Sequence, residues 1–154
     1  MLKKLSHQAV LTGFLVFGLS TAAFAASPPS AGLGQAWPNT VDVSRSPNWH
    51  AYVFMLGGVK YVQINDINGN VLGAVGTANG QFITLPIGRF SQLVATPQEP
   101  AATPSTASAA ASPATVYQDS TTQITATPLS NGTVKLNALS STCTDPVECS
   151  NRVQ

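Results

Sequence analysis

One histidine stands beside groups that could support acid–base or nucleophilic chemistry. His50 directly follows Trp49, and a short way upstream lie Asp42, Ser44 and Ser46. A histidine, a carboxylate that orients it and a serine nucleophile are the groups of a hydrolytic triad. No Gly-x-Ser-x-Gly elbow surrounds either serine, however. We therefore predict no catalytic residue and favour a structural role for His50 at the entry to a strand. A small hydrolase centred on His50 is the alternative.

Cys143 and Cys149 are the two cysteines of the chain. The Asp-Pro pair at 145–146 between them is typical of a turn that could bring the two thiols together. In an exported protein such a pair favours a disulfide, which would contribute about 2–3 kcal/mol by restricting the unfolded chain. Redox motifs usually space their cysteines by two residues, and no histidine lies nearby. We therefore expect a disulfide rather than a redox or metal site.

Segment 66–70 (DINGN) places oxygen-bearing side chains at alternate positions, as does the first half of a calcium-binding loop. The match then fails, because Val71 stands where that loop needs a glycine and Thr77 stands where it needs a bidentate glutamate. We therefore predict a polar hairpin turn at this segment. We expect neither a metal site nor a cofactor.

The first 25 residues have the pattern of a targeting segment. Lys3 and Lys4 precede the apolar run 10–19, which is too short to span a bilayer unaided, and residues 23–25 (Ala-Phe-Ala) fit a small-x-small cleavage site. This segment resembles a bacterial Sec-type signal peptide. We therefore expect cleavage after residue 25 and export through the inner membrane, so that the protein is periplasmic or secreted. No second apolar stretch of spanning length is present in the sequence, so we expect no membrane-spanning segment after cleavage.

Charged residues are scarce, at 8% of the chain against about 25% in an average soluble domain. The formal net charge is +1, and it becomes −1 once Lys3 and Lys4 leave with the signal peptide, because five basic residues then face six acidic ones. This balance excludes a basic nucleic-acid-binding protein. We expect no nucleic-acid partner.

Residues 37–95 have the pattern of a small antiparallel sheet. Three dipeptides suited to tight turns, Gly-Gly at 57–58 and Asn-Gly at 68–69 and 79–80, separate runs rich in β-branched and aromatic residues. We predict a mainly β protein whose first domain, 37–95, is a four-stranded antiparallel meander. Its expected strands are 51–56, 59–66, 71–77 and 82–87.

Tight turns also decide which side chains share a face of this sheet. In the expected register Phe54 lies opposite Tyr61, and Gln63 lies opposite Ala74. One face then carries the apolar residues Tyr52, Phe54, Leu56, Val59, Tyr61, Leu72, Ala74, Ile83, Leu85 and Ile87. The other carries Ala51, Val53, Met55, Val62, Ile64, Val71, Val75 and Phe82.

Both faces of the expected sheet are largely apolar, so something must cover each of them. The candidates are the segment that holds Trp37 and Trp49, the segment after residue 115, and another chain. We expect the chain's own ends to have too few large apolar residues to cover both faces. We therefore expect a protein partner or self-association.

The remaining segments flank this domain. Residues 26–36 are small and contain two adjacent prolines, so we expect a flexible N-terminal segment. Residues 96–115 consist mostly of Ala, Pro, Thr and Ser with no large apolar side chain to bury, which predicts a disordered linker. Residues 116–154 hold the disulfide loop and a second hairpin with strands at 123–127 and 133–137. That hairpin is too small to be stable alone and must dock on the meander or fray.

These patterns favour a non-enzymatic exported protein that acts as a binding or assembly module of the bacterial cell envelope. The alternatives are the small secreted hydrolase centred on His50, and a secreted inhibitor or effector that presents the edge or the turns of its sheet to a partner. The candidate interaction surface consists of aromatic residues and the histidine: Trp49, His50, Tyr52, Phe54, Tyr61 and Phe82.

Overall fold

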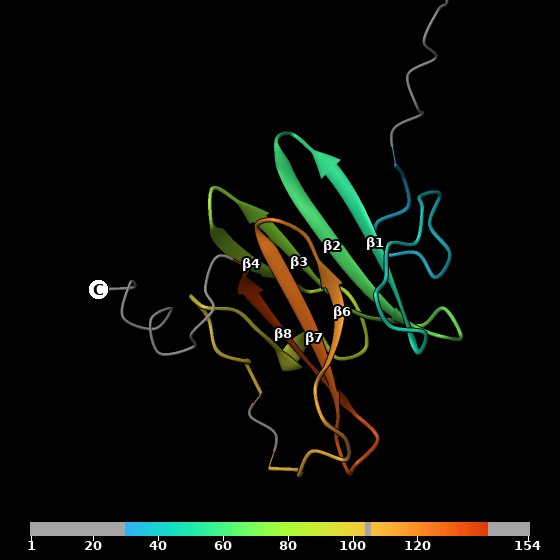
Figure 1. The fold of residues 1–154 in the computed structure, drawn as a ribbon, viewed down its shortest axis with the longest axis vertical. Helices are drawn as coiled ribbons and strands as arrows, with labels where there is room; N and C mark the ends of the chain where they lie inside the picture. Colours follow the sequence, from blue (N-terminus) through green and yellow to red (C-terminus); the bar gives the residue numbers. More distant parts are fainter. Residues whose placement is uncertain (1–29, 104–105, 142–154) are drawn as a thin grey trace, which may run out of the picture.

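The structure, a computed structural model, describes residues 30–103 and 106–141. These residues form two four-stranded β-sheets that pack face to face (Figure 1). No helix among them is long and apolar enough to cross a membrane. The predicted signal peptide at residues 1–25 and the predicted disulfide between Cys143 and Cys149 lie outside the described residues.

The first sheet is the predicted antiparallel meander, and the prediction of a mainly β protein is confirmed. Its strands follow one another in chain order: β1 (Trp49–Leu56), β2 (Val59–Asp66), β3 (Val71–Ala78) and β4 (Gln81–Leu85). Phe54 lies opposite Tyr61, and Gln63 lies opposite Ala74, as the turn spacing predicts.

Two of the tight turns show why this register could be predicted. The turn after β1 holds Gly57 and Gly58 at φ values of 58° and 81°. The turn between β3 and β4 holds Asn79 and Gly80 at 51° and 78°. Glycine and asparagine adopt positive φ at low cost, and such turns match the twist of the strands they join. Pro86 follows the edge strand β4, where its missing N–H removes no ladder hydrogen bond.

A β-bulge in the second hairpin changes two positions of the predicted faces. The pairing of β2 with β3 shifts between Ile64, which lies opposite Gly73, and Asn65, which lies opposite Val71. The extra residue, Leu72, turns toward the second sheet and joins the core, while Val71 takes the other face with Asn65. The predicted faces of Leu72 and Val71 are wrong because a bulge adds one residue to one strand only.

The second sheet is built from the chain after the meander. Its strands, in spatial order, are β5 (Val94–Ala95), β8 (Val134–Ser140), β7 (Thr122–Pro128) and β6 (Ala114–Gln118). β5 runs parallel to β8, and the other pairs are antiparallel. The predicted C-terminal hairpin is β7 and β8, and it docks on the meander.

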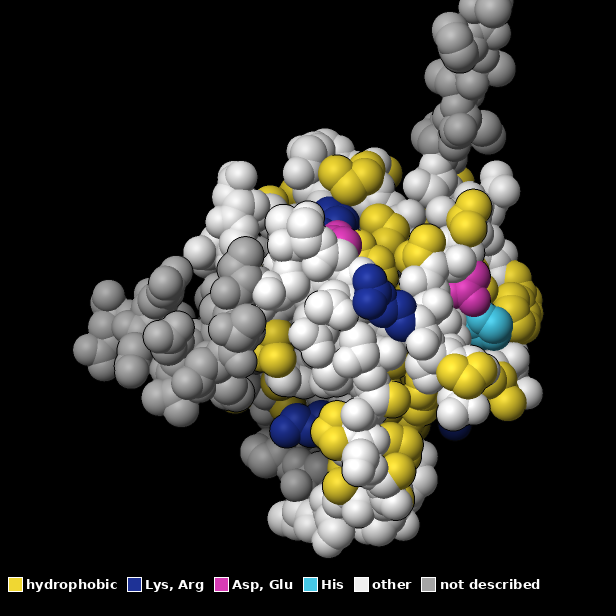
Figure 2. Space-filling view, in the orientation of Figure 1, with side chains coloured by type: hydrophobic (Ala, Val, Ile, Leu, Met, Phe, Trp, Pro, Cys, Tyr) yellow, Lys and Arg dark blue, Asp and Glu magenta, His cyan; other side chains and the backbone are white. Residues whose placement is uncertain are grey.

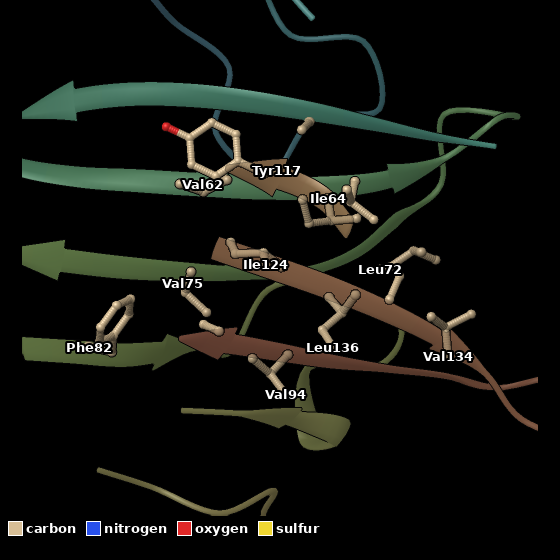
Figure 3. Packing of buried hydrophobic residues seen from close by; sticks show 14 residues of the cluster. Val62, Ile64, Leu72, Val75, Phe82, Val94, Tyr117, Ile124, Val134 and Leu136 are labelled. Carbon is tan, nitrogen blue, oxygen red and sulfur yellow. The ribbon is translucent and has the colours of Figure 1, made fainter. Parts of the chain in front are cut away.

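The hydrophobic core lies between the two sheets, and both contribute to it (Figure 3). A short 3₁₀ turn, η1 (Ser91–Leu93), leads directly into β5. Gly73 allows the sheets to approach closely, because a Cβ atom there would lie 2.8 Å from the side chains of both Leu136 and Val94. The buried cluster consists of Ala51, Val62, Ile64, Leu72, Val75, Phe82, Val94, Val116, Tyr117, Ile124, Ala126, Val134, Leu136 and Ala138.

The opposite face of the first sheet meets residues 31–43, which we call the N-terminal segment. Gln63 Oε1 accepts a hydrogen bond from Gly34 N (2.6 Å), and Asn65 Nδ2 donates one to Ala36 O (2.7 Å). Both amide side chains are fully buried. Polar side chains of β2 therefore hold this segment against the sheet.

The chain's own ends cover the face next to the N-terminal segment only in part. On the face next to the N-terminal segment, Phe54 is 1% exposed and Tyr52 is also buried. The opposite face packs against the second sheet. On the same face as Phe54, however, Leu56 and Ile83 are 48% and 55% exposed, so the N-terminal segment leaves part of this face open to solvent, as the count of large apolar residues predicts.

Residues 96–115, the predicted linker, make defined contacts where the structure describes them. Thr103 N donates to Gln92 O (3.0 Å), and Ala110 N donates to Pro128 O (2.8 Å). The last two residues of this range already belong to β6. Disorder of this segment, and the division of the chain into separate parts, stay predictions.

Candidate functional site

The side chains of His50 and Asp42 contact each other on the surface of the first sheet. Asp42 Oδ2 lies 2.7 Å from His50 Nδ1, and both side chains are partly exposed, at 37% and 26%. Figure 2 shows the histidine beside an acidic side chain and next to hydrophobic side chains at the border of the molecule. His50 lies near the start of β1, as its sequence position predicts.

The N-terminal segment places Asp42 against the edge of β1. Asp42 and Tyr52 form an isolated antiparallel bridge, and Val43 N donates to Ala51 O (2.9 Å). Asp42 Oδ1 accepts hydrogen bonds from Ala51 N (3.0 Å) and from Ser44 N (2.9 Å). Burial acts to raise the pKa of Asp42, but the hydrogen bonds from His50, Ala51 and Ser44 outweigh it and hold the pKa below its usual value.

Trp37 extends this pair into a row of rings. Its ring centroid lies 5.4 Å from that of His50 in an edge-on arrangement, and His50 stacks on Tyr52 at 6.1 Å. The indole also lies on Gly69, where a Cβ atom would come within 2.5 Å of it. We call Trp37, Asp42, His50 and Tyr52 the Trp37 cluster.

The cluster has part of the chemistry of a hydrolytic triad. The carboxylate at Nδ1 orients the imidazole and leaves Nε2 without a hydrogen-bond partner among the described residues. Ser44, however, does not contact the ring. Its Oγ lies 2.8 Å from Trp49 O and 2.9 Å from Ser46 O, so its proton is directed at backbone carbonyls. Ser44 therefore supplies no nucleophile to His50.

Only some residues of the predicted interaction surface are accessible to solvent in the structure. His50, Trp49 and Tyr61 are half-buried, and Trp49 packs against the border of the core. Tyr52, Phe54 and Phe82 are buried, with Phe82 on the opposite face of the first sheet from the other two, so they are not exposed to a partner in this structure. The parity of a strand assigns a side chain to a face, but it does not show which segment covers that face.

Segment 66–70 forms a polar turn that its own aspartate closes. Asp66 Oδ1 accepts hydrogen bonds from Asn68 N (2.9 Å) and Asn70 N (2.8 Å), and Oδ2 accepts one from Asn70 Nδ2 (2.8 Å). The carboxylate is therefore committed to the turn. Within the described part of the chain, no three His, Cys, Asp or Glu side chains are placed to hold a metal ion.

A second charged cluster ties the two sheets together. Lys60 Nζ of β2 lies 2.6 Å from Asp119 Oδ2, in the turn between β6 and β7. Tyr117 OH donates to the same oxygen (2.6 Å), and the backbone N–H groups of Thr121 and Thr122 donate to Oδ1 (2.8 Å each). Burial acts to raise the pKa of Asp119, but the bonds from Lys60 and Tyr117, with those from the turn, hold it well below its usual value. These contacts link the turn between β6 and β7 to β2.

A hollow of about 580 Å³ lies away from these clusters, against β7 and β8. Alanine, proline and threonine side chains of residues 100–113 line one side of it, and two threonines of β7 and Lys135 and Asn137 of β8 line the other. Lys135 is the one charged residue among the described residues that line it. It brings together no acid–base or nucleophilic set, so the Trp37 cluster is the better candidate site.

Sequence reasoning missed Trp37 and Asp42 as partners of His50. It considered Asp42 only as a neighbour along the chain and Trp37 only as cover for the sheet. A usable signal was present in β2, where two amides, Gln63 and Asn65, interrupt a largely apolar face. Buried amides need partners, and the backbone of the glycine-containing segment 29 residues upstream supplies them.

Searches against protein-family models, curated proteins and solved structures found no match. The Trp37 cluster is therefore interpreted from its own geometry and chemistry.

Proposed function

We propose that the protein is a non-enzymatic binding or assembly module of the bacterial cell envelope, exported to the periplasm or the medium. The observation that supports this most is the display of Trp37. Trp37 is 59% exposed, yet the contacts of its indole with Gly69 and His50 fix the position of the ring. A large aromatic side chain held rigidly at the surface is typical of interface centres, because it loses little entropy on binding.

The surroundings of Trp37 favour a protein partner. Val41 and Ile67, on the two segments that flank the cluster, are both strongly exposed. Asp42 and His50 add a carboxylate and an imidazole for hydrogen bonds at the rim. An apolar centre with a polar rim is the usual anatomy of a protein–protein interface. Export rests on the resemblance of residues 1–25 to a signal peptide.

The proposal is tested by capturing partners from an envelope extract with the purified protein. Trp37→Ala should reduce the captured partner at least tenfold, because truncating a central aromatic anchor costs about 2 kcal/mol or more. Ile83→Ala is the matched control, since Ile83 is similarly exposed (55%) but lies on the far edge strand, β4. If both variants lose the captured partner equally, or if neither variant loses it, the result counts against a binding surface at Trp37.

The contact between Asp42 and His50 supports one second candidate, a small secreted hydrolase. Its nucleophile would have to be a water molecule activated by His50 Nε2, because Ser44 is directed elsewhere. In that case His50→Ala should abolish hydrolysis of simple ester or peptide substrates while Trp37-dependent capture persists. If the wild-type protein hydrolyses none of them, this candidate fails.

A further inference from the structure

A segment of small residues lies against the outer face of the second sheet. We call the described residues between 100 and 113 the strap. They follow β5 along the chain and lead into β6 (Figure 1). Near one end Thr103 N donates to Gln92 O (3.0 Å), and near the other Ala110 N donates to Pro128 O (2.8 Å). Backbone hydrogen bonds therefore hold the strap to the rest of the fold on both sides.

The hollow of about 580 Å³ lies between the strap and strands β7 and β8. Small-molecule sites in proteins have volumes of about 300–1,000 Å³, and packed interiors otherwise leave few voids larger than a water molecule. The strap has only alanine, proline, serine and threonine side chains, so no large side chain of its own fills the space. The hollow is therefore large enough for a small organic ligand.

Polar side chains without protein partners form the floor of the hollow. Thr125 lies opposite Asn137 and Thr127 lies opposite Lys135, so all four side chains share the face of the sheet that is turned away from the core. None of the four makes a hydrogen bond or an ion pair to another residue that the structure describes. Two hydroxyl groups, one amide and one ammonium group are thus free to bind a ligand.

Lys135 gives the hollow a positive charge. It is the one charged side chain among the described residues of the lining. An adjoining hollow of about 360 Å³ also has a single charged residue among its described lining residues, and that residue is the cation Arg89. Glu99, which comes directly before the strap, accepts a hydrogen bond from Thr84 on β4 (3.0 Å). Since no described carboxylate pairs with Lys135, the site favours an anion.

The rest of the lining is mostly apolar and consists of Leu93, Leu129 and the alanines and prolines of the strap. We propose that the hollow binds a small amphipathic carboxylate. The carboxylate accepts hydrogen bonds from Lys135 Nζ and from the polar floor, and the apolar body lies against the strap and the two leucines. A few polar groups that fix orientation within an apolar lining are typical of small-molecule sites. This site is separate from the Trp37 cluster and goes beyond the proposed function.

Calorimetric titration with octanoate, octanol and octylamine tests both parts of the ligand, because the three share one chain and differ in the charge of the head group. Octanoate should bind most tightly and octylamine least. Lys135→Met should weaken octanoate binding about fivefold and leave octanol binding unchanged. Arg45→Met is the matched control, since it removes the same charge at an exposed position outside the hollow. It should bind octanoate as the wild type does.

Amide chemical shifts of the full chain show where octanoate binds. The amides of Thr125, Thr127 and Asn137 should shift, and those of Trp37 and His50 should not. Equal affinity for the three head groups, or unchanged octanoate affinity in Lys135→Met, overturns the inference because the charge then selects nothing. Equal shifts with acetate overturn it because the lysine then attracts any anion. Absence of octanoate binding, or shifts confined to other residues, also overturns it. Trp37-dependent partner capture would persist in each of these cases.

Discussion

Two amide side chains decide how the N-terminal segment lies on the first sheet. Gln63 and Asn65 occupy adjacent positions on one face of β2, are fully buried, and hydrogen-bond to each other (2.9 Å). Their remaining groups bond to the backbone of residues 34–36 and, for Asn65, to Gly69 O (3.2 Å). Since Trp37 follows this segment directly and lies on Gly69, the same bonds position the indole.

Replacing Gln63 with the apolar Met should therefore loosen the Trp37 cluster from a distance. The substitution keeps most of the volume but leaves Gly34 N–H and Gln35 O without their partner, which costs about 1–3 kcal/mol for a buried group. We expect a lower free energy of unfolding in urea and faster exchange of the Gly34 amide. Gln118→Met, at an exposed position, should change stability by less than about 0.5 kcal/mol. Equal stability of the two variants would contradict the role of the buried amide.

Asp119 should make the stability of the protein depend on pH in acid. Its pKa in the folded protein lies below that of the unfolded chain, so the ionised carboxylate stabilises the fold above about pH 4. This stabilisation is lost as the pH falls below that value toward the folded pKa. We expect the free energy of unfolding of the wild type to fall between pH 5 and pH 2 more steeply than that of Asp119→Asn. Parallel pH curves would show that the carboxylate makes no such contribution.

Among the elements, β3 carries a close approach between the two sheets at Gly73. Its small residue Gly73 faces Leu136 and Val94 at a distance that leaves no room for a methyl group. Here the bulge at Leu72 and the glycine act together, because the bulge turns a large side chain into the core beside a position that has none. Dense packing of this kind makes a core sensitive to single added atoms.

Gly73→Ala should consequently destabilise the fold by about 1–3 kcal/mol, through overpacking against the second sheet. Leu136→Ala alone should cost about 2–5 kcal/mol by leaving a cavity. Combined, the two changes should cost less than their sum, because the smaller residue at 136 makes room for the added methyl group. Chemical denaturation of the four proteins measures this coupling. If the two losses of unfolding free energy add strictly in the double variant, residues 73 and 136 are not in steric contact.

The strands were predictable where local signals determine them, and the packing around them was not. Gly57 and Asn79 stand in turns whose chemistry fixes two hairpins, so the meander and its register follow from the sequence. The bulge at Leu72 has no local signal, since the same residues would pair regularly without it. The site was missed for a related reason, because Trp37 reaches His50 through contacts of β2 with a distant segment that strand periodicity does not describe.

On the scale of the whole molecule, the meander and the C-terminal hairpin share one hydrophobic core, although the sequence pattern assigns them to separate parts of the chain. Buried side chains from residues 51–82 lie against buried side chains from residues 94–138. Either segment alone would leave its half of this core in water, at about 25 cal/mol for each Å² of apolar surface. The Lys60–Asp119 contact adds a polar link across the same boundary.

A cut between residues 104 and 105 should therefore leave the two halves together. A site-specific protease sequence inserted there allows one cleavage without other damage. The nicked protein should elute as a single particle of unchanged size under native conditions and separate into two fragments in denaturant, since the cut removes none of the buried contacts between the sheets. Its midpoint of urea unfolding should be lower and should rise with protein concentration, because refolding becomes bimolecular. If the fragments separate without denaturant and residues 37–95 stay folded alone, the shared core contributes little and residues 96–115 act as the tether that their composition predicts.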